Sequence, residues 1–291
     1  MSVGIKLKLI RLFSNFIFKL SRKFVPSYIF AHPFFYKIGD FVLKISAPKD
    51  GIYEIQGFKI KLGRTTRFLP LVGEFSESST IELIRKEVQK GMHVFDLGAN
   101  IGWFTLVFSK LVGHTGHVYS FEPDPYTFGI LKENIKLNNL KNVSIFQLAT
   151  SNKVGTANLY LDYSQDGSNK LKTKTQNENS VEIKTTTLDE FCKEHKTNVD
   201  LIKMDIEGSE PKTFEGMKNV ILKNPNIKIV SEFFPGAIKE TGSSPQGYLN
   251  LLERSEFIIN QIDEKNLGKF KPFSQEELLK VKICNLYCFK S

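Results

Sequence analysis

After residue 90, short apolar runs alternate along the chain with segments whose apolar residues recur at helical spacing. Seven apolar runs are typical of strands and lie near residues 93–97, 117–121, 143–147, 199–205, 227–233, 257–263 and 283–289. The helical segments lie near residues 102–112, 125–138, 187–196, 211–223 and 245–255. Alternation of this kind predicts a mostly parallel sheet with helices on both faces. We therefore expect an α/β fold built on a doubly wound, seven-stranded sheet.

Two hairpins and one further helix are predicted around this sheet. Residues 51–63 alternate around a glycine and read as a hairpin, and residues 78–90 read as a helix that stops at Gly91. Between the third and fourth core strands, residues 157–161 and 181–185 predict the arms of a second hairpin. The polar residues between these arms form a surface loop in this interpretation, placed where it can cover a substrate.

The first fifty residues differ from the rest of the chain. Residues 1–39 contain no acidic residue, and their basic positions recur every three or four residues opposite an apolar face. This pattern predicts a basic amphipathic helix of the kind that lies on anionic membrane surfaces. Packing of the helix on the remainder of the chain, or on another subunit, is an equally good interpretation. We expect an N-terminal extension over residues 1–50 and a catalytic domain over residues 51–291.

Composition adds limits to this picture. The net charge of +9 favours an anionic partner, such as lipid head groups, nucleic acid or an acidic glycan. The three cysteines, Cys192, Cys284 and Cys288, have no metal-ligand or redox spacing, and a sparse, odd number suits a reducing compartment. We expect a cytoplasmic protein, with peripheral attachment to the inner face of the membrane through residues 1–25 as the alternative.

The first core strand runs into a glycine turn and then a helix, over residues 94–105 (Val-Phe-Asp-Leu-Gly-Ala-Asn-Ile-Gly-Trp-Phe-Thr). The glycines allow a ligand to approach the backbone closely, and the helix N-terminus favours an anionic group such as a carboxylate. The Gly98-x-x-x-Gly102 spacing has neither the three glycines of a dinucleotide site nor the Gly-Lys ending of a triphosphate loop. Asp96, just before the turn, suits an amine beside that carboxylate. S-Adenosylmethionine carries this pair in its methionine moiety.

The second strand strengthens this prediction. Glu122 and Pro123 follow it about twenty residues later, where an acid can bind both hydroxyls of a ribose. The alternative is that Asp96 and Glu122 are ordinary strand-end acids of another doubly wound sheet. The residues expected to bind the cofactor are Asp96, Gly98, Ala99, Asn100, Gly102, Thr105, Glu122, Pro123, Gln147 and Asp205.

Three blocks of this sequence together resemble the FkbM-type methyltransferases. They are residues 96–102 (Asp-Leu-Gly-Ala-Asn-Ile-Gly), 121–123 (Phe-Glu-Pro) and 203–210 (Lys-Met-Asp-Ile-Glu-Gly-Ser-Glu), with Thr-Leu-Asp-Glu at 187–190 before the third. The resemblance extends over most of the chain after residue 50. It implies a Rossmann-like class I methyltransferase fold whose last strand is antiparallel to its neighbours. It also implies S-adenosylmethionine as the donor and O-methylation, often of a sugar hydroxyl.

The third block supplies the candidate catalytic groups. Lys203, Asp205 and Glu207 share one side if the strand persists that far. Methyl transfer to a hydroxyl requires a group that holds the oxygen and accepts its proton. Asp205 is our first choice as the base or as a metal ligand. Lys203 can act as a base only if burial lowers its pKa, and an ion pair at the rim is the simpler role for it.

Glu232 ends the next strand and matches a glutamate that ends the corresponding strand in the family that the chain resembles. Asp205 and Glu232 would then end adjacent strands, and two carboxylates with waters can hold Mg²⁺. Some class I sugar O-methyltransferases use a metal in this way. We expect Glu232 to orient the acceptor by a hydrogen bond, and a magnesium site remains the alternative.

The predicted function is therefore O-methylation of a hydroxyl on a glycan, a glycolipid or a related small molecule. RNA 2′-O-methylation is the alternative, because a Lys-Asp-Glu set is present, but nucleic acid is the less favoured partner. Base N-methylation is disfavoured, since no Asp/Asn-Pro-Pro-aromatic segment occurs. A non-catalytic, membrane-associated binding protein is disfavoured because the cofactor turn and both acids are intact.

Overall fold

The computed structural model describes residues 48, 50–63, 78–160 and 180–290 of the chain. The chain divides into two compact units, Met1–Ser76 and Glu77–Ser291. The basic helix expected within residues 1–25 and nearly all of the expected polar loop lie outside the described residues. The expected domain boundary at residue 50 stays a prediction.

The described part of the first unit is a hairpin. Strands β1 (Ile52–Ile55) and β2 (Phe58–Lys61) pair antiparallel around Gln56 and Gly57, both in left-handed conformation with φ 50° and 83°. Two left-handed residues are what a tight two-residue hairpin turn requires, and glycine adopts that conformation without a steric penalty. The structure confirms this predicted hairpin.

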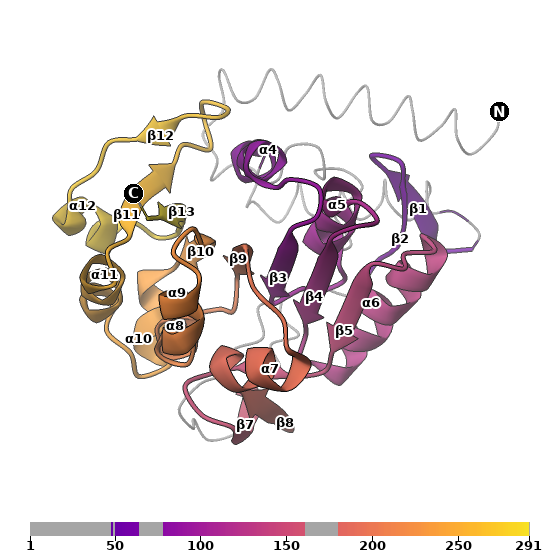
Figure 1. The fold of residues 1–291 in the computed structure, drawn as a ribbon, viewed down its shortest axis with the longest axis horizontal. Helices are drawn as coiled ribbons and strands as arrows, with labels where there is room; N and C mark the ends of the chain where they lie inside the picture. Colours follow the sequence, from indigo (N-terminus) through magenta and orange to yellow (C-terminus); the bar gives the residue numbers. More distant parts are fainter. Residues whose placement is uncertain (1–47, 49, 64–77, 161–179, 291) are drawn as a thin grey trace, which may run out of the picture. The chain divides into compact units, whose positions relative to one another are not determined.

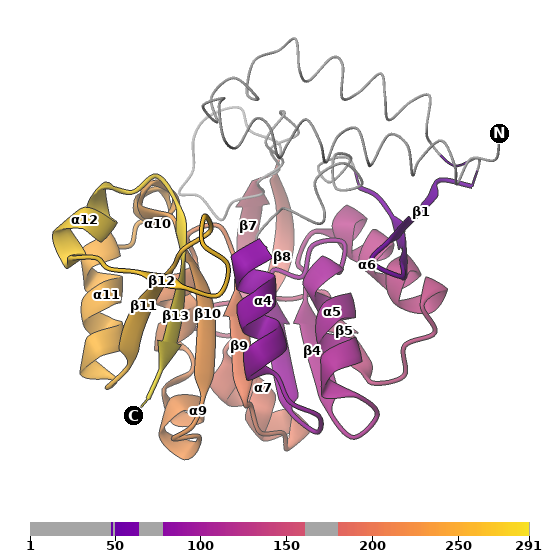
Figure 2. The same ribbon diagram turned by 90° about the horizontal axis from the view of Figure 1, so that it is seen from above.

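The second unit contains an eight-stranded sheet (Figures 1 and 2). Its order is β12 (Phe270–Lys271), β11 (Ile258–Ile262), β13 (Cys284–Phe289), β10 (Lys228–Phe233), β9 (Leu201–Met204), β3 (His93–Leu97), β4 (His117–Phe121) and β5 (Val143–Phe146). The strands from β10 to β5 are parallel, whereas β13 is antiparallel to both of its neighbours. All seven predicted strands are confirmed. The eighth, β12, has only two residues, too few to leave a pattern in the sequence.

Helices cover both faces of this sheet. The main core packs residues of α7 (Leu188–His195), α8 (Glu210–Glu215), α9 (Lys218–Lys223) and α11 (Pro245–Arg254) on one face, and α4 (Ser78–Glu87) contributes to a smaller cluster with Val230 and Tyr287. The other helices are α5 (Trp103–Val112), α6 (Pro125–Leu137), α10 (Pro235–Glu240) and α12 (Gln275–Lys280).

The predicted helix over residues 211–223 is divided into α8 and α9. The break falls at Gly216, where a Cβ atom would lie 2.1 Å from the backbone oxygen of Ser151. Residue 216 must therefore be glycine for the two backbones to approach. Nearby, β6 (Ala149–Thr150), β7 (Gly155–Tyr160) and β8 (Ser180–Thr186) form a separate three-stranded sheet, and the antiparallel β7–β8 pair confirms the second predicted hairpin.

The register of the parallel strands places the predicted site residues at one edge. Asp96 of β3 pairs with Lys203 of β9, and Met204 of β9 pairs with Ser231 of β10. The carboxyl ends of these strands therefore lie side by side, which is where ligands bind in open α/β sheets. Among the described residues, none of the helices has the length and apolar character needed to cross a bilayer.

Candidate active site

The turn after β3 packs directly against the end of β9. The Asp205 N–H donates to the Leu97 oxygen at 3.1 Å, and Gly98 has a left-handed φ of 77°. A Cβ atom on Gly98 would lie 1.8 Å from the Asp205 oxygen, far inside contact distance. The absence of a side chain at this position is therefore what allows the cofactor turn and the candidate catalytic residue to lie next to each other.

The backbone amides of this turn are engaged within the protein. The Gly98 and Ala99 N–H groups both donate to the Phe121 oxygen, at 3.0 and 2.9 Å, and the Asn100 N–H donates to Glu122 Oε2 at 2.8 Å. The Gly102 N–H donates to the Ala99 oxygen. These contacts fix the turn to the end of β4. They leave recognition of a ligand to side chains and to the first turn of α5.

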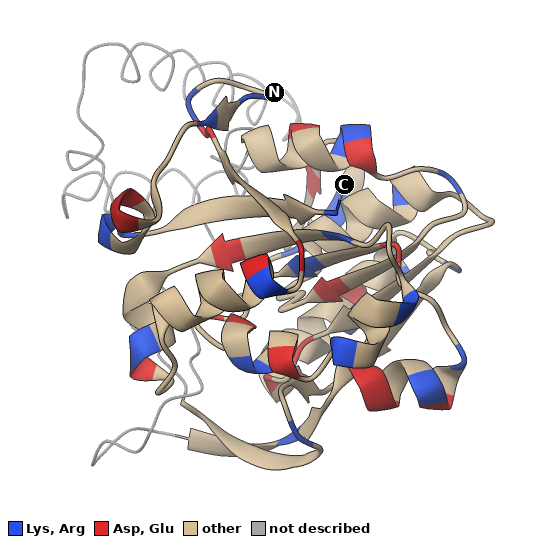
Figure 3. Cartoon of the chain, turned by 60° about the vertical axis from the view of Figure 1, so that its left-hand side comes forward, with Lys and Arg blue, Asp and Glu red and all other residues tan. Residues whose placement is uncertain are grey.

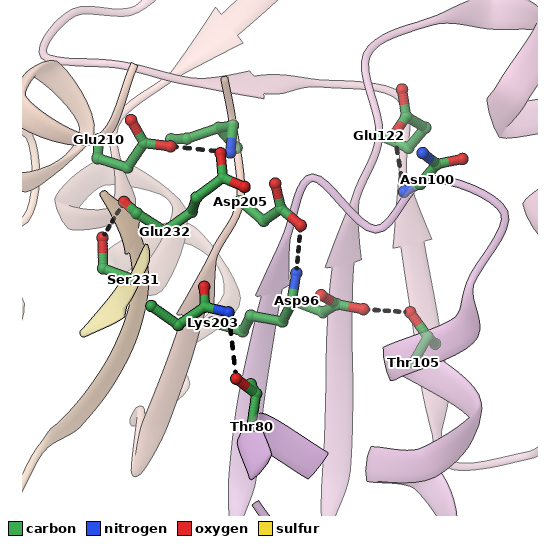
Figure 4. Close-up of polar contacts among 12 residues, drawn as sticks. Thr80, Asp96, Asn100, Thr105, Glu122, Lys203, Asp205, Glu210, Ser231 and Glu232 are labelled. Atoms are coloured by element: carbon green, nitrogen blue, oxygen red, sulfur yellow. Dashed lines mark hydrogen bonds and ion pairs between the residues drawn. The ribbon is translucent and has the colours of Figure 1, made fainter. Parts of the chain in front are cut away.

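Asp96 is fully buried behind the turn (Figure 4). Its Oδ2 accepts a hydrogen bond from the Thr105 hydroxyl at 2.6 Å, and that hydroxyl is 2.9 Å from the Ser120 hydroxyl. Burial raises the pKa of Asp96, and the charge of Lys203 opposes this rise. Its Oδ1 is buried and has no hydrogen-bond partner among the described residues. The positively charged amine of S-adenosylmethionine would supply the missing donor, so this carboxyl fits the predicted cofactor.

Thr105→Val is expected to lower the free energy of unfolding by about 1–3 kcal/mol, because it leaves a buried Asp96 oxygen without its donor. It should also weaken the binding of S-adenosylhomocysteine, the product form of the cofactor, in calorimetry. Thr213→Val is the matched control, since it removes a buried hydroxyl 3.0 Å from that of Thr150, outside this turn. A similar loss of stability with unchanged binding is expected for the control. Equal binding by both variants would contradict the role of Thr105.

Glu122 is held by backbone amides of the cofactor turn and of the segment that follows β4. Its Oε2 accepts from the Asn100 N–H, and its Oε1 accepts from the Asp124 N–H at 2.9 Å. Burial raises the pKa of Glu122 to about 8. The Asp124 and Asn100 N–H groups oppose this rise, and ribose hydroxyls that donate to the same oxygens would favour the ionised form further. Pro123 lies beside Glu122 and is half-buried, whereas Gln147 is exposed after β5. Cofactor binding by all three stays a prediction.

Lys203 and Asp205 form an ion pair at the end of β9 (Figure 4). The Lys203 Nζ lies 3.0 Å from Asp205 Oδ2 and 4.4 Å from the centre of the Phe104 ring. The side chain of Lys203 is 5% exposed, whereas that of Asp205 is 30% exposed. The contact of an ammonium group with a carboxylate and an aromatic face favours the ion-pair role over that of a base. Asp205 is the partner that a ligand can reach.

Glu207 does not share the strand geometry of Lys203 and Asp205. Strand β9 ends at Met204, and Glu207 lies in the following turn with a left-handed φ of 52°. The expected alternation along an extended strand therefore stops before Glu207. The next residue, Gly208, is also left-handed, and a Cβ there would lie 2.4 Å from the Ala237 backbone. Two successive left-handed residues turn the chain sharply into α8.

Glu232 extends toward the space between Asp205 and Glu210 (Figure 4). Burial raises the pKa of Glu232 well above its usual range, and the charges of Asp205, Glu207 and Glu210 add to the rise. Its Oε2 is buried without a hydrogen-bond partner among the described residues. A carboxyl group in its neutral form can donate a hydrogen bond. Glu232 is thus suited to hold an acceptor oxygen and not to remove its proton.

The magnesium alternative finds no support in the described part of the chain. No group of three or more histidine, cysteine, aspartate and glutamate side chains there is arranged to hold a metal ion. The carboxylates of Asp205 and Glu232 are near each other, but Lys203 occupies one oxygen of Asp205. The ammonium group of Lys203 therefore neutralises the Asp205 carboxylate, which a metal ion would otherwise do.

Glu210 is a residue of the site whose role sequence reasoning missed. Its Oε1 accepts from the Ile206 N–H at 3.0 Å, and the residue is 1% exposed. The bond spans the turn that carries Asp205 and Glu207, so Glu210 holds that turn in place. Ser120 and Phe104 were likewise not assigned. The contacts of Ser120 and Phe104 join residues of different strands and helices, so the local sequence gives no sign of them. Only Glu210 had a local signal, because it is an acidic residue in the first turn of a helix.

Glu210→Gln is expected to change how stability depends on pH. Burial raises the pKa of Glu210 from 4.5 to about 8, so its neutral form is favoured in the folded state. Its contribution is present below about pH 4.5 and is lost as the pH rises toward 8. Glutamine keeps an acceptor for Ile206 but cannot ionise. The variant should therefore match the wild type near pH 4 and become progressively more stable than the wild type as the pH rises to 9.

Urea unfolding at a series of pH values checks this expectation. Glu194→Gln, an exposed position on α7, is the matched control and should follow the wild type at every pH. Parallel curves for wild type and Glu210→Gln would show that Glu210 is not neutral in the folded protein.

Part of the chain is similar in sequence to known proteins. A family model described as "Methyltransferase FkbM domain" matches residues 96–260. Over 155 residues the chain is 28% identical to the hexuronic acid methyltransferase AglP of Haloferax volcanii, a match that covers 53% of this chain and 61% of that protein. Over 67 residues it is 37% identical to the ribosomal protein L11 methyltransferase of Caldanaerobacter subterraneus, covering 23% and 21%. The chain thus spans less than two thirds of either relative.

Solved structures of methyltransferases are similar at a lower level. A SAM-dependent methyltransferase from Aquifex aeolicus has a TM-score of 0.42 at 16% identity, with 79% of this chain and 100% of that chain covered. A SAM-dependent O-methyltransferase from Thermotoga maritima has a TM-score of 0.42 at 12% identity, with 86% and 81% covered. Structural similarity at these TM-scores and identities does not indicate which reaction the chain catalyses.

Proposed function

The chain belongs to the FkbM methyltransferase family, and from this premise we propose that it transfers the methyl group of S-adenosylmethionine to a hydroxyl of a sugar. The single observation that carries the proposal is the placement of Asp205. Its partly exposed carboxylate lies at the end of β9, next to the Gly98 turn and in an ion pair with Lys203. This placement supports Asp205 as the base beside the predicted donor site.

The residues of the site divide into a donor side and an acceptor side. On the donor side, Asp96 would bind the amine and Glu122 the ribose of the cofactor. Bound S-adenosylmethionine would supply an electrophilic methyl group. On the acceptor side, Asp205 would take the proton of the attacking hydroxyl, and Glu232 would donate a hydrogen bond that orients it. Lys203 would hold the Asp205 carboxylate in place through their ion pair.

The name of one relative supports a sugar acceptor, because AglP is by name a hexuronic acid methyltransferase. The net charge of +9 favours an anionic partner of any class. We extend the proposal to a sugar on an acidic or lipid-linked glycan, which the basic helix predicted in residues 1–25 would help to approach. Cytoplasmic location, on or near the membrane, is part of the same proposal.

The test is a methyl-transfer assay with labelled S-adenosylmethionine and three sets of acceptors: uronic acid glycosides, neutral oligosaccharides and RNA. We expect mass spectrometry to find an added methyl group on a sugar, stable to mild alkali as an ether is. Loss of the label in alkali would instead show a methyl ester on a carboxylate and would overturn the assignment of the hydroxyl. Labelling of RNA alone would replace the sugar acceptor by the 2′-hydroxyl of RNA.

Calorimetry with S-adenosylhomocysteine tests the donor side separately. Binding by the wild type, lost in Asp96→Ala and in Glu122→Ala, is the expected result. Absence of binding by the folded wild-type protein would reject the proposed donor.

A further inference from the structure

The loop between β11 and β12, residues 263–269, lies beside the acceptor side of the site. Leu286 of β13 pairs with both Gln261 of β11 and Ser231 of β10, so the loop begins at the level where β10 reaches Glu232. A chain of contacts confirms this position. Glu264 accepts from the Thr80 hydroxyl at 2.7 Å, and Thr80 in turn accepts from Asn285, the register partner of Glu232.

Large apolar side chains are exposed on this hairpin. Leu267, in the loop, is 61% exposed, and Phe270, in β12, is 42% exposed. The Phe270 ring stacks on Tyr287 with a 9° angle between the ring planes, which holds β12 against the sheet. Leu267 has neither a ring nor a polar side-chain atom with which to make a contact of that kind. It stands in a sequence of exposed residues from 265 to 272.

The acidic residues of the loop accept hydrogen bonds within the protein, whereas the lysines of the loop are exposed. Asp263 accepts hydrogen bonds from the Lys265 N–H and from the Asn266 side chain, and Glu264 caps α4 through the Ser79 N–H. Figure 3 shows basic and acidic residues interspersed over the described part of the chain. Lys265, Lys269 and Lys271 all lie in the exposed run. The tip therefore presents an apolar residue between lysines.

We propose that this hairpin contacts an anionic membrane surface, with Leu267 entering the interface and Lys265, Lys269 and Lys271 binding lipid head groups. Apolar insertion combined with basic residues is the usual chemistry of such contacts. Lysines on a strand at the sheet edge also prevent pairing with other strands, but that role does not explain an exposed leucine at the tip. The contact would bring the acceptor side of the site to the membrane. It does not depend on the methyl-transfer reaction.

Insertion is measured directly with a tryptophan at the tip of the full-length chain. Leu267→Trp adds a reporter to a protein whose one native tryptophan, Trp103, is 9% exposed and is corrected for with the parent protein. Vesicles of phosphatidylcholine with phosphatidylglycerol and brominated acyl chains quench a tryptophan that enters them. We expect strong quenching for Leu267→Trp, none on pure phosphatidylcholine vesicles, and a several-fold loss in high salt.

Leu222→Trp is the matched control. Leu222 is 77% exposed in α9, a helix that leads to the amino end of β10 and so to the opposite edge of the sheet. It should remain unquenched. Equal quenching at both positions, no quenching at 267, or no binding to anionic vesicles would each overturn the proposal. Competition by a soluble acidic glycan without quenching at 267 would also overturn it, in favour of a glycan at these lysines.

A second comparison tests the lysines. The double variant Lys265→Gln, Lys269→Gln should reduce partitioning into anionic vesicles several-fold, and Lys218→Gln, Lys223→Gln in α9 should not. Methyl transfer to a soluble acceptor should be the same in all four proteins that carry hairpin or α9 changes. An inactive wild type that still inserts Leu267→Trp would refute the proposed function alone.

Discussion

Gly98→Ala is expected to abolish S-adenosylhomocysteine binding and to lower the free energy of unfolding by about 2–5 kcal/mol. The left-handed backbone at this position costs a non-glycine residue about 1–2 kcal/mol. The new methyl group would also overlap the Asp205 oxygen, and a forced overpacking costs typically 1–3 kcal/mol. That oxygen belongs to backbone and cannot swing aside. The turn and the end of β9 must therefore separate, which moves Asp96 and Asp205 apart.

Gly242→Ala separates the two causes. Gly242 has a similar φ of 80°, but nothing lies within 4 Å of a Cβ there. The free energy of unfolding of this control should therefore fall only by the cost of the left-handed backbone, about 1–2 kcal/mol, and the control should still bind S-adenosylhomocysteine. Urea unfolding and calorimetry on the three proteins measure both effects. If Gly98→Ala binds S-adenosylhomocysteine as the control does, the contact between the turn and β9 does not shape the donor site.

Asp205→Asn is expected to lower the rate of methyl transfer by about 10²–10⁴-fold, the usual contribution of a positioned base. Asparagine has the same shape and can still accept from Lys203, so the site should keep its structure. It cannot take a proton from the attacking hydroxyl. Because Asp96 and Glu122 are unchanged, S-adenosylhomocysteine should bind with nearly the affinity of the wild type. The loss should appear in kcat, measured with the acceptor that the transfer assay identifies.

Asp200→Asn is the matched control on the same segment. Asp200 precedes β9 and accepts from the His93 N–H at 2.7 Å, at the end of the strand away from the site. Its replacement should leave kcat unchanged. A rate for Asp205→Asn within a few-fold of wild type would show that the acceptor loses its proton to another group. A large loss of cofactor affinity would instead assign Asp205 to the donor side.

The sheet was predictable because its strands are buried on both faces. In β9, for example, Leu201, Ile202 and Met204 are fully buried, and only Lys203 interrupts the apolar run. Such runs are visible in the sequence. The acids that follow these runs were predictable for the same reason, since parallel strands end at one edge. Asp96, Glu122, Asp205 and Glu232 could thus be assigned to one rim without any knowledge of their contacts.

The contacts themselves could not be predicted. The hydroxyl pair of Thr105 and Ser120, and the position of Phe104 under Lys203, depend on how a helix lies across neighbouring strands. The short elements β12 and α12 depend on packing at the edge of the sheet, and two or six residues carry too little periodicity to predict them. Glu207 was placed with Asp205 by assuming that the strand continues to residue 207, but β9 ends three residues earlier, at Met204.

The place of β13 in the sheet has a consequence for how the enzyme is made on the ribosome. The strands of the donor side, β3, β4 and β9, lie within residues 93–204 and can pair as soon as these have left the exit tunnel. Strands β10 and β11 do not touch each other, because β13 lies between them and is translated after both. Until then the nascent chain exposes an unpaired strand edge, a known hazard for aggregation. Glu232 acquires its neighbour Asn285 only at that point, so the acceptor side is the last part of the site to be assembled.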